Sequence, residues 1–213
     1  MSTMKKYIVE FVGTFFLVLT IIMSVLGGAG SFAPLAIGSA LMVMIYAGGH
    51  ISGGHFNPAV TLAVFLRGKI SSGDMLPYMA AQILGGVVAA LVAALLLSGL
   101  AGATAPTPGV HASVPALIAE FLGTFALAWV VLNAATSKGT DGNSFYGLAI
   151  GFTVLAMAYA LGGVSGGAFN PAVAIGLSVA EMFSWGEIWI YLVGCLGGGA
   201  VAAFLYNYIN GND

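Results

Sequence analysis

The sequence has 213 residues, of which 60% are hydrophobic and 6% charged, and its mean hydropathy is +1.04. Soluble domains carry about 25% charged residues, so this composition excludes a soluble globular protein and predicts an integral membrane protein. The net charge of -2 leaves no basic surface for nucleic acid, and the single cysteine, Cys195, excludes an intrachain disulfide.

The first apolar stretch follows Lys5 and Lys6, a pattern that a signal peptide also shows. This stretch is long enough to span a bilayer and carries Glu10, which favours a membrane helix. The sequence contains no linker or low-complexity segment. We therefore interpret residues 1–213 as a single transmembrane domain.

Six stretches reach the roughly 20 residues that a helix needs to cross a hydrocarbon core of ~30 Å. They cover approximately 7–27, 33–50, 76–98, 114–135, 144–163 and 187–209. Typical helix-start residues precede three of them: Ser71, Ser72 and Asp74; Asp141, Asn143 and Ser144; and Ser184 with Glu187 in a capping-box pattern. Two further apolar runs, about 58–67 and 171–181, are half as long and too short to cross.

The positive charges predict the orientation of the chain. If the short runs enter the membrane and return, all five basic residues fall on the side of the N-terminus: Lys5, Lys6, Arg67, Lys69 and Lys138. Cytoplasmic loops carry the excess of Lys and Arg. The sequence therefore predicts that both termini are cytoplasmic.

The two halves of the chain repeat. Between residues 35 and 60, 16 of 26 positions are identical to the residue 113 positions further on, and "EFVGTF" at 10–15 returns as "EFLGTF" at 120–125. We place the repeats at about 5–98 and 114–209. Each contains three crossings and one re-entrant run, so the second repeat starts on the opposite side of the membrane, as in an inverted repeat.

Each short run begins at a polar interruption, "GGHFNPAV" at 53–60 and "GGAFNPAV" at 166–173. Irregular backbone at membrane depth is tolerated where it is buried in protein or lines a watery cavity. Asn57 with Pro58, and Asn170 with Pro171, have the order of an N-cap followed by the first helical residue. The sequence therefore predicts two half-helices that start near the bilayer centre and whose N-termini face each other.

Two facing N-termini create a positive potential that opposes the entry of cations. An asparagine cap accepts hydrogen bonds from its own helix through its oxygen, and its amide hydrogens can donate to a passing solute. These features predict a pore for small neutral molecules, with Asn57 and Asn170 close to a shared solute. Two kinked helices in an ordinary transporter core are the simpler alternative.

The motifs "HISGGHFNPAVT" and "SGGAFNPAV" make the sequence resemble the aquaporins, or major intrinsic proteins, over essentially its full length. The resemblance implies an all-α bundle of six transmembrane helices and two re-entrant half-helices with an inverted repeat. It also implies one pore per subunit, homotetramers in a cell membrane and no cofactor. The residues that it assigns to the two pore motifs are Asn57, Pro58, Ala59, Asn170, Pro171 and Ala172.

The resemblance also identifies a departure. Water-selective members continue the second motif with an arginine, whereas this chain has Val173. Ungapped matching places the other positions of the outer constriction at Ile37, Ala158 and Gly167. None of the four side chains is charged or a large ring, so we expect a wide, apolar neck. Water, ammonia, urea, hydrogen peroxide and glycerol all remain candidate solutes.

The remaining polar residues allow other interpretations. Glu10 and Glu120 lie within membrane segments, and a proton-coupled transporter would use such groups. Their symmetric placement favours buried acceptors for the re-entrant loops. His50 and His55 could suggest a metal pair, but a loop-bracing His55 and a His50 in the cytoplasmic vestibule fit better. No nucleophile, base and acid set predicts an enzyme.

Overall fold

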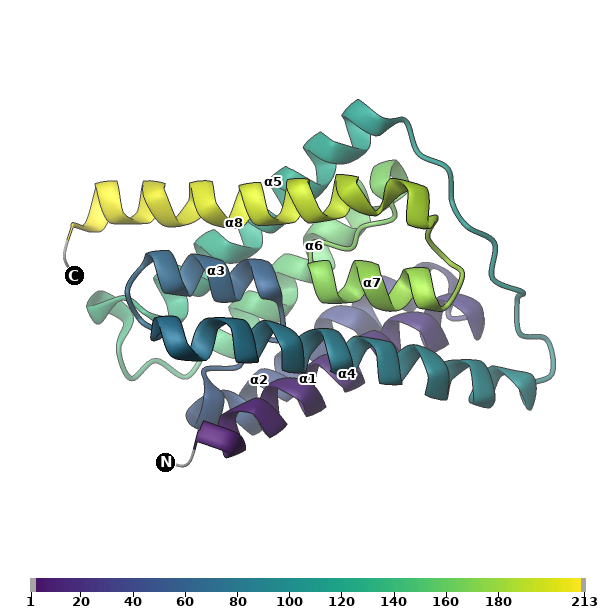
Figure 1. Cartoon of the computed structure of the whole chain (residues 1–213), viewed down its shortest axis with the longest axis horizontal. Helices are drawn as coiled ribbons and strands as arrows, with labels where there is room; N and C mark the ends of the chain where they lie inside the picture. Colours follow the sequence, from purple (N-terminus) through teal and green to yellow (C-terminus); the bar gives the residue numbers. More distant parts are fainter. Residues whose placement is uncertain (1–2, 212–213) are drawn as a thin grey trace.

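The computed structural model describes residues 3–211, and these form eight α-helices and three short 3-10 turns. The described residues form no sheet, and one isolated bridge joins Gly109 to Phe183. Figure 1 shows the helices as one bundle, with both chain termini at the same end. The predicted all-α class is confirmed.

All six expected spans are present as long apolar helices. They are α1 (Thr3–Leu26), α2 (Ala33–Ser52), α4 (Ser72–Ser98), α5 (Ser113–Ala135), α6 (Tyr146–Ser165) and α8 (Ile188–Asn210). The two short runs form α3 (Pro58–Leu66) and α7 (Pro171–Val179), nine residues each. The 3-10 turns are η1 (Gly30–Phe32), η2 (Lys138–Thr140) and η3 (Trp185–Glu187).

Two expected helix starts differ from the structure. Ser71 caps α4 as predicted, by accepting from the backbone N–H of Asp74. Ser184 instead caps the short turn η3, and the Glu187 carboxylate contacts the loop residue His111 rather than the helix start, so the predicted capping box is wrong. Before α6, the Asn143 side chain accepts from Phe145 but does not cap the helix itself.

The two halves have the same element order and the same packing. α1 packs on α2 and α4, and α5 packs on α6 and α8. The halves meet where α2 crosses α6: a Cβ on Gly38 would lie 2.7 Å from the carbonyl oxygen of Gly151, and one on Gly151 would lie 2.5 Å from that of Gly38. Glycine at both positions lets the two backbones approach this closely.

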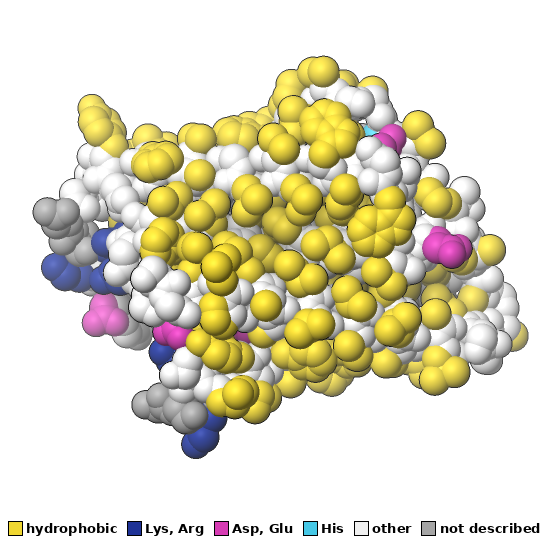
Figure 2. Space-filling view, viewed as in Figure 1, with side chains coloured by type: hydrophobic (Ala, Val, Ile, Leu, Met, Phe, Trp, Pro, Cys, Tyr) yellow, Lys and Arg dark blue, Asp and Glu magenta, His cyan; other side chains and the backbone are white. Residues whose placement is uncertain are grey.

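The outer surface is apolar along the middle of the bundle and charged at its ends. Figure 2 shows the Lys and Arg side chains at one end, where some acidic side chains also lie, and further acidic side chains with a histidine toward the other end, which shows no Lys or Arg in this view. We call these the basic end, which carries Lys6, Lys69 and Lys138, and the acidic end, which carries Glu181 and Glu187. An apolar belt between two polar ends is the surface that a bilayer-spanning protein requires.

Candidate functional site

The segments before α3 and α7 bend sharply. Gly53 and Gly54 have φ of 95° and 65°, and Gly166 and Gly167 have φ of 88° and 68°. Phe56 and Phe169 follow, each with φ of 48°, which is uncommon for a residue with a side chain. Such a conformation persists only where the surroundings hold it in place.

Glu10 holds the first bend. Its carboxylate is fully buried and accepts from the backbone N–H groups of His55 at 3.0 Å and Phe56 at 2.7 Å. The Ser52 hydroxyl and the Gln82 amide donate to the same carboxylate at 2.6 and 2.7 Å. All four donors belong to the re-entrant loop or to the helices that flank it.

Glu120 holds the second bend in the same way. It is fully buried and accepts from the N–H groups of Ala168 at 3.0 Å and Phe169 at 2.6 Å, and from the Ser165 hydroxyl at 2.7 Å. Cys195 takes the place of Gln82 as the fourth donor, at 3.4 Å. The repeated motif at residues 10–15 and 120–125 therefore supplies one loop-binding carboxylate to each half.

The glycine of the same motif admits an aromatic ring. A Cβ on Gly13 would overlap the ring of Phe56, and a Cβ on Gly123 would overlap the ring of Phe169. Glutamate binds the backbone of each left-handed phenylalanine while glycine accommodates its side chain. The sequence showed that this motif repeats, but not that its glycines receive the two rings.

Asn57 and Asn170 are the N-caps of α3 and α7. Their side-chain oxygens accept from the N–H groups of Ala59 and Ala172 at 2.8 and 2.9 Å. The amide of Asn57 donates to the carbonyl of Phe169 at 2.9 Å, and that of Asn170 donates to the carbonyl of Phe56 at 2.8 Å.

These crossed hydrogen bonds qualify the expectation that the asparagine amides are wholly free. Each amide group carries two hydrogens, and one of them binds the opposite half. The other hydrogen of each amide takes no part in the crossed bonds. The crossed bonds also explain the left-handed conformation of the two phenylalanines, because it directs the carbonyl of each to the asparagine in the other half of the chain.

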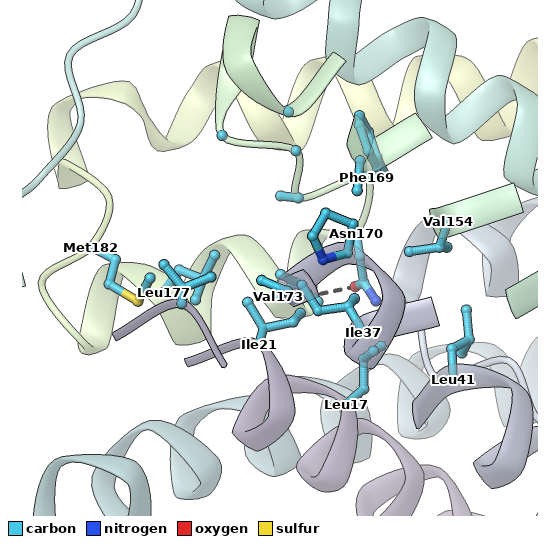
Figure 3. Close-up of a pocket in the computed structure, with 18 of the residues that line it drawn as sticks. Leu17, Ile21, Ile37, Leu41, Val154, Phe169, Asn170, Val173, Leu177 and Met182 are labelled. Carbon is cyan, nitrogen blue, oxygen red and sulfur yellow. Dashed lines mark hydrogen bonds between the residues drawn. The ribbon is translucent and has the colours of Figure 1, made fainter. Parts of the chain in front are cut away.

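A cavity of about 450 Å³ lies beside the two asparagines, which both line it. All four residues that sequence matching placed at the constriction also line this cavity: Ile37, Ala158, Gly167 and Val173. Figure 3 shows Ile37 of α2 and Val173 of α7 near each other beside Asn170. Pro58, Ala59, Pro171 and Ala172 are buried behind it in the first turns of the half-helices.

Further lining residues escaped the sequence analysis. Leu17, Ile21 and Val25 form one face of α1 at the spacing of successive turns, and Gly162 of α6 faces the cavity with open space where a side chain would lie. The α1 residues escaped because residues 15–26 are almost all apolar, so hydropathy does not distinguish the face of the helix that meets the cavity. His111 also lines the cavity, and its being the one ionisable residue between 99 and 113 is the signal that could have identified it.

A second cavity, of about 420 Å³, opens at the basic end and shares His55 and Val131 with the first. His55 lies 3.2 Å from Thr61 through Nδ1 and is mostly buried, and its position between the two cavities adds to its expected loop-bracing contact. His50 lines a third cavity at the same end. Among the described residues, no three His, Cys, Asp or Glu side chains are close enough to hold a metal ion.

The profile of the family described as "Major intrinsic protein" matches residues 1–206. The aquaporin AqpM of Methanothermobacter thermautotrophicus is 34% identical, over 98% of this chain and 98% of its own length. The glycerol uptake facilitator protein-like 6 of Lactiplantibacillus plantarum is 36% identical, over 99% and 100%. Aquaporin NIP1-1 of Oryza sativa is 38% identical, over 96% and 74%.

The fold agrees with these relatives. The X-ray structure of the aquaglyceroporin from Plasmodium falciparum superimposes with a TM-score of 0.83, covering 98% of this chain and 97% of that one at 23% identity. The family profile and the relatives extend over the paired half-helices and over both asparagine caps. The chain belongs to the major intrinsic protein family and is an integral, multi-pass membrane protein.

Proposed function

We propose that water and small neutral solutes cross the membrane passively through the first cavity, past Asn57 and Asn170, and leave through the second. The observation that carries this proposal is the crossed pair of asparagines, which face a 450 Å³ cavity from two opposed half-helices. The two cavities share His55 and Val131, which supports one path from end to end. Relatives named aquaporin and glycerol uptake facilitator support a channel and not an enzyme.

The half-helices exclude protons and metal ions in this proposal. Each helix N-terminus carries about half a positive charge, and two of them converge at the asparagine pair. The donors there are fixed by their crossed bonds, so they offer hydrogens to a solute oxygen and no chain of acceptors for a proton. A neutral molecule meets no corresponding electrostatic barrier.

The side chains of the neck favour solutes larger than water. Gly167 has no side chain, Ala158 has a methyl group, and Val173 stands where water-selective members have arginine. A wide neck without donors admits ammonia, urea, hydrogen peroxide and glycerol more easily than one narrowed by a guanidinium, which carries five donors. It does not replace the hydration that a polar solute loses, so we expect moderate water flux.

A proton-coupled transporter is not favoured. Glu10 and Glu120, the carboxylates that coupling would need, do not line the cavity, and each already accepts four hydrogen bonds. Coupling requires a group that exchanges protons with the path, whereas these two hold the re-entrant loops.

Orientation and assembly complete the proposal. The basic end faces the cytoplasm, with both termini, because Lys and Arg are enriched on that side of membranes. The exposed apolar residues along the bundle meet lipid or neighbouring subunits, and the family resemblance supports a homotetramer with one pore in each subunit.

Stopped-flow light scattering on proteoliposomes of the purified chain tests this function. A channel gives urea, glycerol and water fluxes that rise linearly with the concentration difference and ignore imposed pH or sodium gradients. Flux that saturates at low solute concentration and follows the proton gradient would refute the passive pore. Empty liposomes provide the lipid background.

A further inference from the structure

One imidazole lies where the first cavity meets the second. His55 lies in the first re-entrant loop, and its ring packs on Tyr78 with centroids 5.2 Å apart. The Tyr78 hydroxyl donates to the carbonyl of Ser52 at 2.8 Å. A Cβ on Gly53, at the start of the bend, would lie 3.1 Å from His55 Nε2.

The second half places another imidazole close to the corresponding position. Tyr191 repeats Tyr78, and its hydroxyl donates to the carbonyl of Ser165 at 2.7 Å. Ala168 stands at the repeat position of His55 and cannot fill that space. Phe183 fills it instead: its ring stacks on Tyr191 with centroids 4.5 Å apart, and a Cβ on Gly166 would lie 2.7 Å from its Cζ. His111, in the long connection between the halves, lies beside these rings: its Nδ1 is 3.5 Å from the Tyr191 hydroxyl, and a Cβ on Gly166 would lie 3.6 Å from its Cε1.

We propose that His111 is a specificity-determining residue, which supplies the polar side chain that the apolar neck lacks and, in its protonated form, selects for solutes bearing a carbonyl group, such as urea. The proposal rests on the proposed function, since it assigns a contact to solutes in the same cavity. His111 lines this cavity beside Gly166 and Gly167, where Ile37, Ala158 and Val173 offer no polar atom. The resemblance to the family assigns no residue of this loop to the constriction.

The surroundings determine which hydrogen bonds the ring can offer. Nδ1 lies 3.5 Å from Glu187 Oε2 and 3.5 Å from the Tyr191 hydroxyl oxygen. The Tyr191 hydroxyl donates its own hydrogen to the carbonyl of Ser165, so its oxygen can only accept from the histidine. Both neighbours are acceptors, so Nδ1 carries a hydrogen and Nε2 is the nitrogen left for a solute. Neutral His111 accepts at Nε2, whereas protonated His111 donates there.

Glu187 positions the histidine. Its Oε1 accepts from the backbone N–H of His111 at 3.4 Å, and its buried Oε2 has no hydrogen-bond partner among the described residues. The Nδ1 hydrogen faces that oxygen at 3.5 Å, and this contact becomes an ion pair when Nε2 is protonated as well. The other ionisable groups near the ring are Tyr191 and, behind Ser165, the buried Glu120. Protonation therefore adds a donor to the neck while the pair with Glu187 becomes neutral.

The test compares urea and water permeability in proteoliposomes with the same pH on both faces, from about pH 8 to about pH 5, where a histidine changes charge. His111→Leu keeps bulk without polar atoms, and His111→Gln keeps a donor that does not titrate. Val110→Ala changes the adjacent, 87% exposed residue of the same loop and serves as the matched control. All variants retain His55.

We expect the urea-to-water ratio of the wild type and of Val110→Ala to rise on acidification. The ratio should be independent of pH in both His111 variants, and about three- to tenfold lower in His111→Leu than in His111→Gln, the effect of one hydrogen bond.

A flat wild-type profile, or a His111→Leu profile like that of the wild type, overturns the role of His111 while leaving the channel intact. A wild type that passes neither water nor urea above the lipid background overturns the proposed function instead. The wild-type profile needs no variant to fold, so the proposal stays testable if a substitution destabilises the protein.

Discussion

At the scale of single residues, the two glutamates and the two asparagines have different roles where the half-helices meet. Glu10 and Glu120 hold the bent backbone from behind, and Asn57 and Asn170 cap the half-helices and bind each other's half. The carboxylates bind loop backbone, whereas both asparagines line the cavity through which we propose that solutes pass. Substitutions should separate the two effects.

Glu120→Gln should destabilise the protein by about 1–3 kcal/mol, because one acceptor oxygen becomes an NH₂ group that faces backbone N–H donors. Thermal unfolding in detergent measures the loss of stability. Glu181→Gln, which changes an exposed glutamate at the acidic end, is the control. The urea-to-water ratio of the folded fraction should stay unchanged. A large change in that ratio without loss of stability would place Glu120 in the conduction path.

Asn57→Asp should preserve the cap but admit protons or cations. The carboxylate still accepts from Ala59, but it cannot donate to the Phe169 carbonyl. Two half-helix N-termini contribute about one positive charge in total, so one carboxylate there cancels most of it. A pH-sensitive dye inside liposomes measures the leak, with Asn170→Asp as the symmetric comparison. If liposomes with either variant show no proton leak, the half-helix dipoles do not set the barrier to protons.

At the scale of elements, the half-helices are positioned by glycines of the long helices. A Cβ on Gly86 of α4 would lie 2.7 Å from the carbonyl oxygen of Ala172, and one on Gly199 of α8 would lie 2.6 Å from that of Ala59. Each half-helix therefore packs directly on the backbone of a long helix. Backbone carbonyls cannot rotate away as a flexible side chain can, so these contacts resist substitution.

Gly86→Ala should destabilise the protein by roughly 1–3 kcal/mol and reduce solute flux, because the added methyl group displaces α7. Gly163→Ala is the matched control, since a Cβ there meets nothing within 4 Å. Unfolding temperature and urea flux are the two measurements. Equal behaviour of the two variants would mean that α7 has room to shift.

Sequence reasoning predicted elements whose signals are local. Asn followed by Pro marked both caps, and run length separated the spans from the half-helices. It failed where a distant residue competes for the same group. Ser184 and Glu187 form a local capping pattern, but Glu187 binds His111, 76 positions earlier in the chain. The crossed bonds between the halves were unpredicted for the same reason.

At the scale of the whole molecule, charge is distributed unequally between the two ends. The basic side chains gather at the end that also holds both termini, and the acidic end carries the long connection between the halves (Figures 1 and 2). This asymmetry supports a single orientation in the membrane. It can be tested because the native Cys195 is fully buried.

Val110→Cys should react with a membrane-impermeant maleimide in intact cells, and Tyr208→Cys only after the cells are permeabilised. Both positions are 87% exposed, at the acidic end and near the C-terminus respectively. The unmodified chain supplies the background. Labelling of Tyr208→Cys alone in intact cells would reverse the proposed orientation.

The central claim is that solutes pass through the cavity beside the asparagine pair and are selected at its apolar neck. Val173 is 2% exposed, lines the cavity and lies in the first turn of α7, so an arginine there must extend into the path. The most direct measurement is the ratio of glycerol to water permeability in proteoliposomes of the wild type and of Val173→Arg. We predict a ratio at least about tenfold lower in the variant, equivalent to roughly 1.4 kcal/mol, because bulk and fixed donors exclude glycerol while water still passes. A wild type that passes water alone, with a ratio that Val173→Arg leaves unchanged, would contradict the account.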